Sequence, residues 1–457
     1  MTRRSRLLAC VVWAFGGLVA CGARSGLDAE LLPAASVDGG GARDGGREAT
    51  AHDAVPPPDA PVMADAPREA RIDATPVVDA GRDAPAGMDA GVDARPDSGP
   101  QADAGVDAAR DAAPDGDAGP AHTTYLKASN SRSGTIFGEL VAISADGNTL
   151  AVSGWNESSD ATGVDGNQSN TSDMGAGAVY VFSRTIGVWT QQAYLKASNT
   201  QLFGAFGLGL ALSADGNTLA VGSDSESSDA TGIDGDQSNM SASRAGAVYV
   251  FTRSAGTWSQ QAYVKASNTR AQSDFGYAVA LSSDGSTMAV GAYGDSSDAT
   301  GVNGVESDMS APGAGAVYVF SRSGTTWSQE AYVKASNTTV GVPANFGVAV
   351  TLSSDGNTLG VGAWNDASDA TGINGDESDT SAPSAGAVYL FSRTGTLWAQ
   401  EAYVKASNAA TGASFGVAVT LSSDASTLAV GAFGEASDAT GIDGNQSDTS
   451  DPGAGAV

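Results

Sequence analysis

The sequence predicts an all-β protein built from repeated four-stranded antiparallel sheets, and three observations lead to this prediction. Glycine is frequent, at 60 of 457 residues, while charged residues make up 16% and aromatic residues 7%, which favours turns and short strands over long solvated helices. The motif Tyr-(Leu/Val)-Lys-Ala-Ser-Asn recurs at a nearly constant spacing. Between its copies, apolar and polar residues alternate, and no helical period is present.

The recurring motif divides the second part of the chain into five units. It begins at Tyr125, Tyr194, Tyr263, Tyr332 and Tyr403, so that successive copies are 69, 69, 69 and 71 residues apart. The units are about 125–193, 194–262, 263–331, 332–402 and 403–457, the last one incomplete, within a repeat region of 122–457. A repeat of this length is one structural unit that packs on its neighbours.

The first half of each unit predicts a β-hairpin. A Phe-Gly pair leads into alternating apolar positions such as Val348, Val350 and Leu352, then a polar turn, then a Leu-Ala-Val-Gly-Ala strand. Asp-Gly supplies the positive φ that such a turn needs, so we interpret these sites as turns. They are Asp146-Gly147-Asn148, Asp215-Gly216-Asn217, Asp284-Gly285-Ser286, Asp355-Gly356-Asn357 and Asp424-Ala425-Ser426.

The second half of each unit predicts another hairpin. In the second unit it runs from Ala245 to Ala266, with Ala-Gly-Ala-Val-Tyr-Val-Phe, a Gly-containing turn and Trp-Ser-Gln-Gln-Ala-Tyr-Val-Lys-Ala. Four strands in about 69 residues match one blade of a β-propeller. A tryptophan recurs at one place, and we expect it to pack between blades rather than to contact a ligand. The four are Trp189, Trp258, Trp327 and Trp398.

These strings resemble the FG-GAP repeat of integrin-alpha-type propellers. Phe-Gly-x-Ala-Val begins at Phe275, Phe346 and Phe415 and is followed by a Val-Gly-Ala strand, and the resemblance covers essentially all of 125–457. Propellers of this family commonly have seven blades. The fifth unit stops at Gly453-Ala454-Gly455-Ala456-Val457, which favours a fragment that ends inside a strand. The alternative is a ring of five blades in which Tyr125 to Ser129 supply the missing outer strand.

The first 20 residues predict a lipoprotein signal peptide. Arg3, Arg4 and Arg6 precede an apolar run from Leu7 to Ala20 that is short for a membrane span. The run ends in Leu-Val-Ala-Cys, which resembles the bacterial lipobox and implies cleavage before Cys21 and lipid attachment to its thiol. Gly22 after the cysteine favours the outer membrane by resemblance to Gram-negative sorting, and the export route, Sec or Tat, stays open.

Residues 21–121 predict a disordered stalk. This segment is rich in Ala, Asp, Gly and Pro, and from Gly22 to Ala121 it contains no Phe, Tyr, Trp or Lys. Such a composition cannot bury enough apolar surface to order the chain. The alternative, an acidic cation-binding tail, would give weak and unshaped coordination.

The loop between the two hairpins is the candidate calcium site. In calcium-binding members of the family the ion sits in the Phe-Gly hairpin, but the turns there hold one carboxylate each. The acids lie instead in Ser-Asp-Ala-Thr-Gly loops, and the alternative is a polar loop whose Asp and Asn side chains satisfy their own backbone. The candidate Ca²⁺ ligands are Asp160, Asp165, Asn167, Asp229, Asp234, Asp236, Asp369, Asn374, Asp376, Asp438, Asp443 and Asn445; the third copy has Val305 at one of these positions.

A lysine also recurs in every unit, two residues after the motif tyrosine. We expect these lysines to lie exposed on an edge strand, where they discourage aggregation, and the alternative is a comb that binds an anionic ligand. They are Lys127, Lys196, Lys265, Lys334 and Lys405.

Composition excludes several functions. The net charge of −29 argues against nucleic acid as a partner. Residues 123–457 contain neither His nor Cys, which excludes Ser-His-Asp triads, Cys nucleophiles and His-bound zinc, and no pair of carboxylates is singled out. We therefore predict a non-enzymatic, lipid-anchored surface propeller that binds a protein or glycan, with Ca²⁺ as its one candidate cofactor. The alternative is an envelope spacer without a specific ligand.

Overall fold

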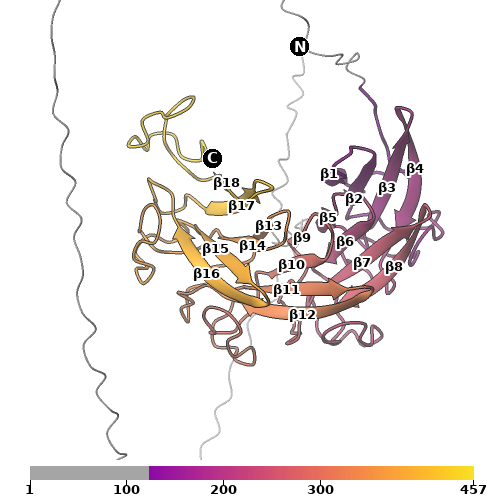
Figure 1. Ribbon diagram of the computed structural model, residues 1–457, viewed down its shortest axis with the longest axis horizontal. Coiled ribbons are helices and arrows are strands. Elements are labelled where there is room, and N and C mark those ends of the chain that lie inside the picture. The colour runs from indigo at the N-terminus through magenta and orange to yellow at the C-terminus, as the bar shows by residue number, and fades with distance from the viewer. Residues whose placement is uncertain (1–122) are drawn as a thin grey trace, which may run out of the picture. The chain divides into compact units, whose positions relative to one another are not determined.

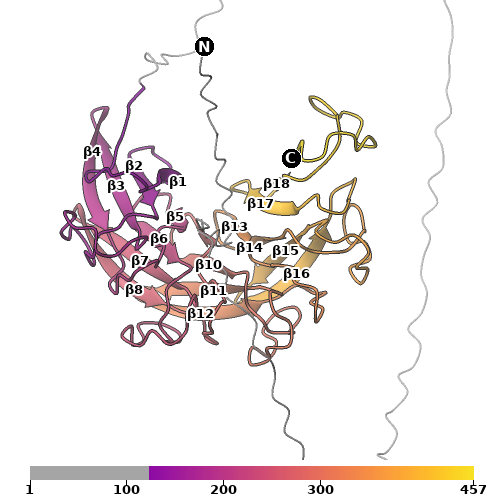
Figure 2. The ribbon, with the colours of Figure 1, turned by 180° about the vertical axis from the view of Figure 1, so that it is seen from behind.

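The computed structural model describes residues 123–457, and every regular element in this part is a β-strand. The predicted signal peptide, Cys21 and the whole predicted stalk lie outside the described residues. Four antiparallel four-stranded sheets and one two-stranded sheet follow one another in chain order (Figures 1 and 2). The all-β, repeated-blade prediction is confirmed.

Each complete blade is a meander of neighbouring strands. The first contains β1 (Phe137–Ile143), β2 (Thr149–Gly154), β3 (Ala178–Thr185) and β4 (Val188–Leu195). The second contains β5 (Gly209–Leu212), β6 (Thr218–Ser223), β7 (Ala247–Ser254) and β8 (Thr257–Val264). The third contains β9 (Val279–Leu281), β10 (Thr287–Ala292), β11 (Ala316–Ser323) and β12 (Thr326–Val333). The fourth contains β13 (Ala349–Leu352), β14 (Thr358–Ala363), β15 (Ala387–Thr394) and β16 (Leu397–Val404).

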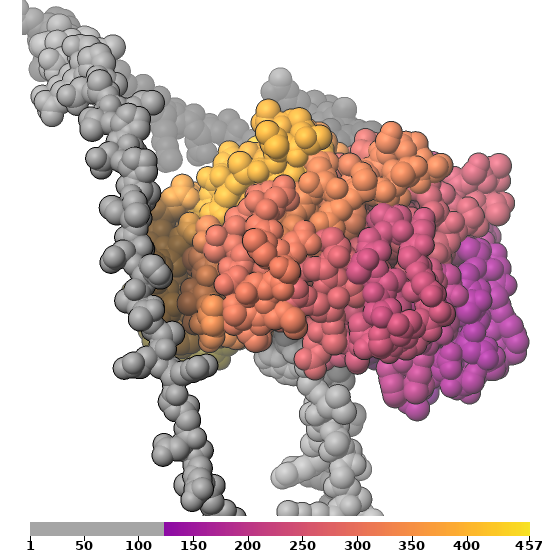
Figure 3. Space-filling model, turned by 90° about the horizontal axis from the view of Figure 1, so that it is seen from below, coloured from indigo at the N-terminus to yellow at the C-terminus, as the bar shows by residue number. Residues whose placement is uncertain are grey.

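The fifth unit has two strands, β17 (Phe415–Leu421) and β18 (Leu428–Ala432), and its last residues begin a third pairing through the bridge between Ala432 and Ala456. This bridge occupies the register of Ala363 with Ala387 in the fourth blade. In space-filling view the units form successive bands of colour from indigo to yellow (Figure 3).

Alternation along the strands gives each blade two different faces, because successive side chains point to opposite sides of a sheet. On β7, Tyr249 and Phe251 pack against Val179 and Val181 of the first blade. On the other face of β7, Val248 and Val250 pack against the aromatic face of the third blade. An aromatic face therefore meets an aliphatic face at each junction between complete blades, and the core lies between the sheets.

The Phe-Gly pair joins one blade to the previous one. In the third unit the Phe275 amide donates to the Ala245 carbonyl of the second blade (3.2 Å), and the Phe275 ring packs edge-on against Tyr318 of its own blade. This close approach of two backbones requires a glycine opposite Phe275. Gly246 has φ +81°, and a Cβ there would lie 2.0 Å from the Phe275 carbonyl oxygen. This pair is therefore a joint between blades.

The Asp-Gly turns are confirmed as hairpin turns. In the first unit Asp146 accepts hydrogen bonds from Ser144 Oγ and from the Asn148 amide, and Gly147 has φ +66°. These hydrogen bonds lower the pKa of Asp146 to about 2. The turns are also linked across the blades, because the Ala145 amide donates to Ala214 and this pattern continues through Ser283, Ser354 and Ser423.

Candidate functional site

The loops between the hairpins and the connections between blades lie at one end of the sheets, and we call this end the loop face. Here the candidate Asp and Asn side chains bond within their own loops. The Asp160 carboxylate accepts hydrogen bonds from Asn170 and, at 2.9 Å, from Ser172 Oγ. Asn167 Oδ1 accepts hydrogen bonds from the backbone amide and the side-chain hydroxyl of Ser169, at 3.0 and 2.6 Å.

The second candidate position anchors the loop to the outer strand. The Asp165 amide donates to the Tyr194 carbonyl at 2.7 Å, and the Tyr194 amide donates to Asp165 Oδ1 at 2.9 Å. Asp165 has φ +54°, which Asp and Asn tolerate better than other residues with a side chain. Asp234 and Asn374 make the same pair of bonds with Tyr263 and Tyr403.

The remaining candidate Ca²⁺ ligands occupy the positions of Asp160, Asp165 and Asn167 in the other loops. The Asp229 carboxylate accepts hydrogen bonds from Asn239 and Ser241, and Asp229, Asp369 and Asp438 are all exposed. The turn bond of Asn167 recurs at Asp236, Asp376 and Asn445, and Asp443 has the positive φ of its column.

As placed, these side chains do not fit a calcium ion, which needs six to eight convergent oxygens. Their oxygens point at separate partners. Among residues 123–457 no group of three His, Cys, Asp or Glu side chains could hold a metal. The geometry favours the alternative of Asx turns, and calcium binding stays a prediction.

The repeated lysines were expected to be exposed, and for four of the five this is wrong. Lys196, Lys265 and Lys334 are 0% exposed and Lys405 is 3% exposed, whereas Lys127 lies at the surface. Each buried ammonium pairs with a buried carboxylate of the same blade, which belongs to the preceding sequence unit. The pairs are Lys196 with Glu157 (3.0 Å), Lys265 with Glu226 (2.7 Å), Lys334 with Asp295 (3.1 Å) and Lys405 with Asp366 (3.0 Å).

Each ion pair is completed by the motif tyrosine and by the next blade. Tyr194 Oη donates to Glu157 at 2.9 Å, and Lys196 Nζ also donates to the Ser159 carbonyl at 2.8 Å. Burial opposes ionisation of Glu157, but Lys196 outweighs this effect and keeps the pKa of Glu157 below its usual value. The motif asparagine then reaches the following blade, as Asn199 donates to Glu226 at 2.8 Å. The buried carboxylates therefore take part in a link between neighbouring blades.

Trp258, Trp327 and Trp398 are buried between blades, as predicted, whereas Trp189 of the first blade is only half-buried. Trp258 is 3% exposed, Arg253 lies 5.4 Å above its ring, and Trp258 Nε1 donates to Gln192 of the first blade at 2.9 Å. Gln192 reaches this position because it is the extra residue of a bulge: Val181 pairs with Ala193, but Phe182 pairs with Gln191. The sequence analysis missed this role of the residue two positions before each motif tyrosine.

Sequence reasoning also missed a charged cluster at the junction between the second and third blades, where the residues depart from the repeat. Between the second and third blades, Arg244 Nε donates to Asp274 Oδ1 at 2.9 Å, and Arg244 Nη2 donates to Tyr293 Oη at 3.3 Å. Asp224 and Asp274 are 5% and 3% exposed. Aligning the units would have found them, because the other units have Gly or Ser in place of Arg244, and Trp, Tyr or Phe in place of Asp224.

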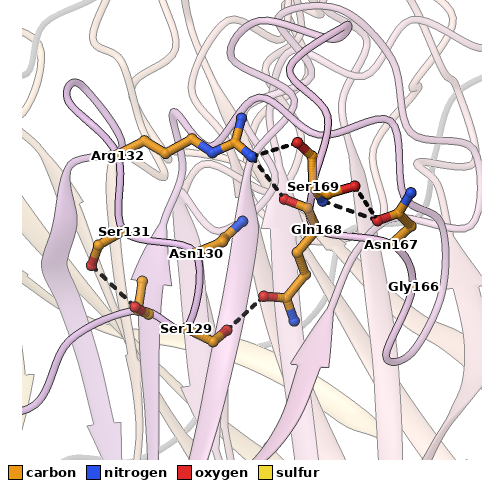
Figure 4. A pocket seen from close by; sticks show the side chains of 9 residues that line it. Ser129, Asn130, Ser131, Arg132, Gly166, Asn167, Gln168 and Ser169 are labelled. Carbon is orange, nitrogen blue, oxygen red and sulfur yellow. Dashed lines mark hydrogen bonds between the residues drawn. The ribbon is translucent and has the colours of Figure 1, made fainter.

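A polar pocket of about 710 Å³ opens on the loop face of the first blade. Its lining consists of Ala128 to Arg132 on one side and Gly166 to Ser169 on the other. Ser129 Oγ donates to Gln168 Oε1 at 2.6 Å, and Arg132 donates to the Ser169 carbonyl at 2.7 Å (Figure 4). Hydroxyl and amide groups therefore surround the opening.

The fold defines the class of protein: a β-propeller of four-stranded blades with joints at Phe-Gly and Gly-Ala-Val strings. Residues 258–320, which span the end of the second blade and most of the third, match the model of the FG-GAP repeat family. Together the match and the blades support an FG-GAP β-propeller. No curated protein matches the chain.

Several solved structures are distantly similar to this chain. They include a putative TolB from Agrobacterium tumefaciens, with 11% identity over 66% of this chain and 75% of the other and a TM-score of 0.30. The Cps50 (Swd1) β-propeller domain of Myceliophteria thermophila has 9% identity over 64% and 79%, with a TM-score of 0.34. Hydrazine synthase of Kuenenia stuttgartiensis has 11% identity over 68% and 78%, with a TM-score of 0.32.

Proposed function

We propose that this protein is an exported lipoprotein whose propeller binds a glycan, without catalysis, through its loop face. The observation that carries the proposal is the pocket at Ser129 and Gln168. Its hydroxyls, amides and single guanidinium can donate to and accept from sugar hydroxyls. The repeated lysines and their partner carboxylates elsewhere form buried ion pairs and a link between blades.

The proposed display of the loop face outside the cell depends on the N-terminal lipoprotein signal. In our proposal Cys21 is acylated and residues 22–121 separate the propeller from the outer membrane. Among the described residues no helix is long and apolar enough to cross a membrane. A Cys21→Ser variant should lose both the incorporation of labelled palmitate and its place in the membrane fraction.

The binding test uses the purified full chain on a panel of immobilised glycans and matrix proteins. We expect a glycan to bind, and Gln168→Ala with Arg132→Ala to weaken that binding about tenfold, which is the loss of about 1.4 kcal/mol. Gln237→Ala is the matched control, because Gln237 makes the same bond to Ser198 in the second unit.

Three outcomes would oppose the proposal. Binding of a protein but no glycan would replace the glycan with a protein ligand. Equal weakening by the Gln237 control would move the contact away from this pocket. A panel with no bound member would favour the spacer.

A further inference from the structure

The junction between the second and third blades holds two buried carboxylates and one arginine. Arg244 is committed to Asp274, since its Nη2 lies 2.8 Å from Asp274 Oδ1. Asp224 accepts a hydrogen bond from Ser225 Oγ at 3.0 Å, and it interacts electrostatically with both Arg244 and Asp274. The three groups are balanced only when one of the carboxyls carries a proton.

The other groups that face this cluster do not supply a second positive charge. Tyr277 and Tyr293 of the third blade pack edge to face over it, with ring centroids 4.8 Å apart. Both phenols have raised pKa values, because of burial and of these carboxylates, and therefore stay neutral near pH 7. Glu139 of the first blade also acts on Tyr277 and adds negative charge.

The cluster sits on backbone that joins two blades. The Asp274 amide donates to the Arg244 carbonyl at 3.1 Å, and the next residue, Phe275, forms the joint to Ala245. The Gly294 amide donates to the Ser273 carbonyl at 3.2 Å. A change in charge at Asp274 therefore acts directly on the connection between the second and third blades.

We propose that Asp224, Asp274 and Arg244 form a proton-linked switch that closes this junction when one carboxyl is protonated and loosens it when both are ionised. The proposal goes beyond glycan binding at the first blade and does not depend on it. Burial raises the pKa of Asp224 to about 6 and that of Asp274 to about 7, and Arg244 opposes the shift.

The sign of the effect follows from these raised values. An ordinary Asp in the unfolded chain titrates near 3.9, so the folded state binds more protons than the unfolded state between about pH 4 and 7. Stability from this cluster is therefore complete below about pH 4 and is lost as the pH rises to about 7. Residues 123–457 contain no histidine, so ordinary groups contribute little between pH 5 and 7.5.

The test is thermal unfolding of the full chain from pH 5 to 7.5, for the natural sequence and for Asp274→Asn. Asn345 stands at this position in the fourth unit with φ +54°, the same value as Asp274, so the substitution suits the backbone. We expect the natural midpoint to fall by about 2 °C or more across this range. Asp274→Asn and, independently, Asp224→Asn should flatten the fall. Asp229→Asn, an exposed loop carboxylate, should leave it unchanged.

Amide hydrogen exchange supplies the local readout. After correction for intrinsic rates, exchange at Asp274, Phe275 and Gly294 should accelerate from pH 5 to 7.5 in the natural protein but not in Asp274→Asn. The proposal is overturned if the midpoint does not fall, if both Asn variants keep the natural slope, or if exchange at these amides is independent of pH.

Discussion

At the scale of single residues, the defining feature of this protein is a charge pair buried in each complete blade. Lys265 and Glu226 are both almost inaccessible to water and are joined at 2.7 Å. Taking two charges out of water is costly, and their attraction offsets this cost only while both partners are present. The motif lysine of the first unit, Lys127, is exposed and provides a comparison.

We predict that Lys265→Met lowers the free energy of unfolding by about 3 to 5 kcal/mol, because the buried Glu226 loses its positively charged partner. Chemical unfolding of the full chain measures this loss. Lys127→Met, the same change at the exposed copy, should cost less than about 0.5 kcal/mol. The double variant Lys265→Met with Glu226→Gln should recover part of the loss. Similar losses at the two lysines would contradict the buried pairing.

At the scale of elements, the blades depend on joints where one backbone passes very close to another. At Gly246 a Cβ would overlap the Phe275 carbonyl, whereas at Gly256, with nearly the same φ of +82°, no atom lies within 4 Å of the added Cβ. Gly246 lies in a joint between blades and Gly256 in the exposed turn between β7 and β8. Alanine substitutions at the two glycines therefore distinguish the cost of backbone strain, which both share, from the cost of steric overlap, which arises only at Gly246.

Gly256→Ala should therefore cost only the strain of a left-handed backbone, about 1 kcal/mol. Gly246→Ala carries the same strain and must also push the second and third blades apart, so we expect a clearly larger loss. Urea unfolding of the two variants side by side measures the difference. Equal losses would show that the joint at Phe275 is loose.

At the scale of the whole molecule, buried side chains of successive blades pack against one another and join the sheets. The loops that were candidates for calcium are held by their own hydrogen bonds, as with Asp160 to Ser172 and Asp165 to Tyr194. We therefore expect the thermal midpoint of the full chain to be the same in millimolar Ca²⁺ and in excess chelator. A rise with Ca²⁺ that Asp160→Asn abolishes would contradict this, because a bound ligand stabilises the folded state by mass action.

The sequence by itself determined the repeat, the two hairpins of each unit, the Asp-Gly turns and the burial of three of the four tryptophans. These features depend on the period of apolar residues and on turn residues a few positions apart, so they can be predicted from short strings. Asp165 and Asp234 were singled out from the sequence as candidate Ca²⁺ ligands, which stays a prediction. Their structural role is to adopt a positive φ and to bond the outer strand.

Only the tertiary structure decided where the charges and irregular residues lie. Lys196 pairs with a carboxylate 39 residues earlier, and Trp258 with a glutamine 66 residues earlier in another blade. The bulge that directs Gln192, and the meeting of Asp224 with Arg244 and Asp274, depend likewise on how sheets stack. A strand pattern states which side of a sheet a lysine occupies, but the neighbouring blade and loop determine whether water reaches it.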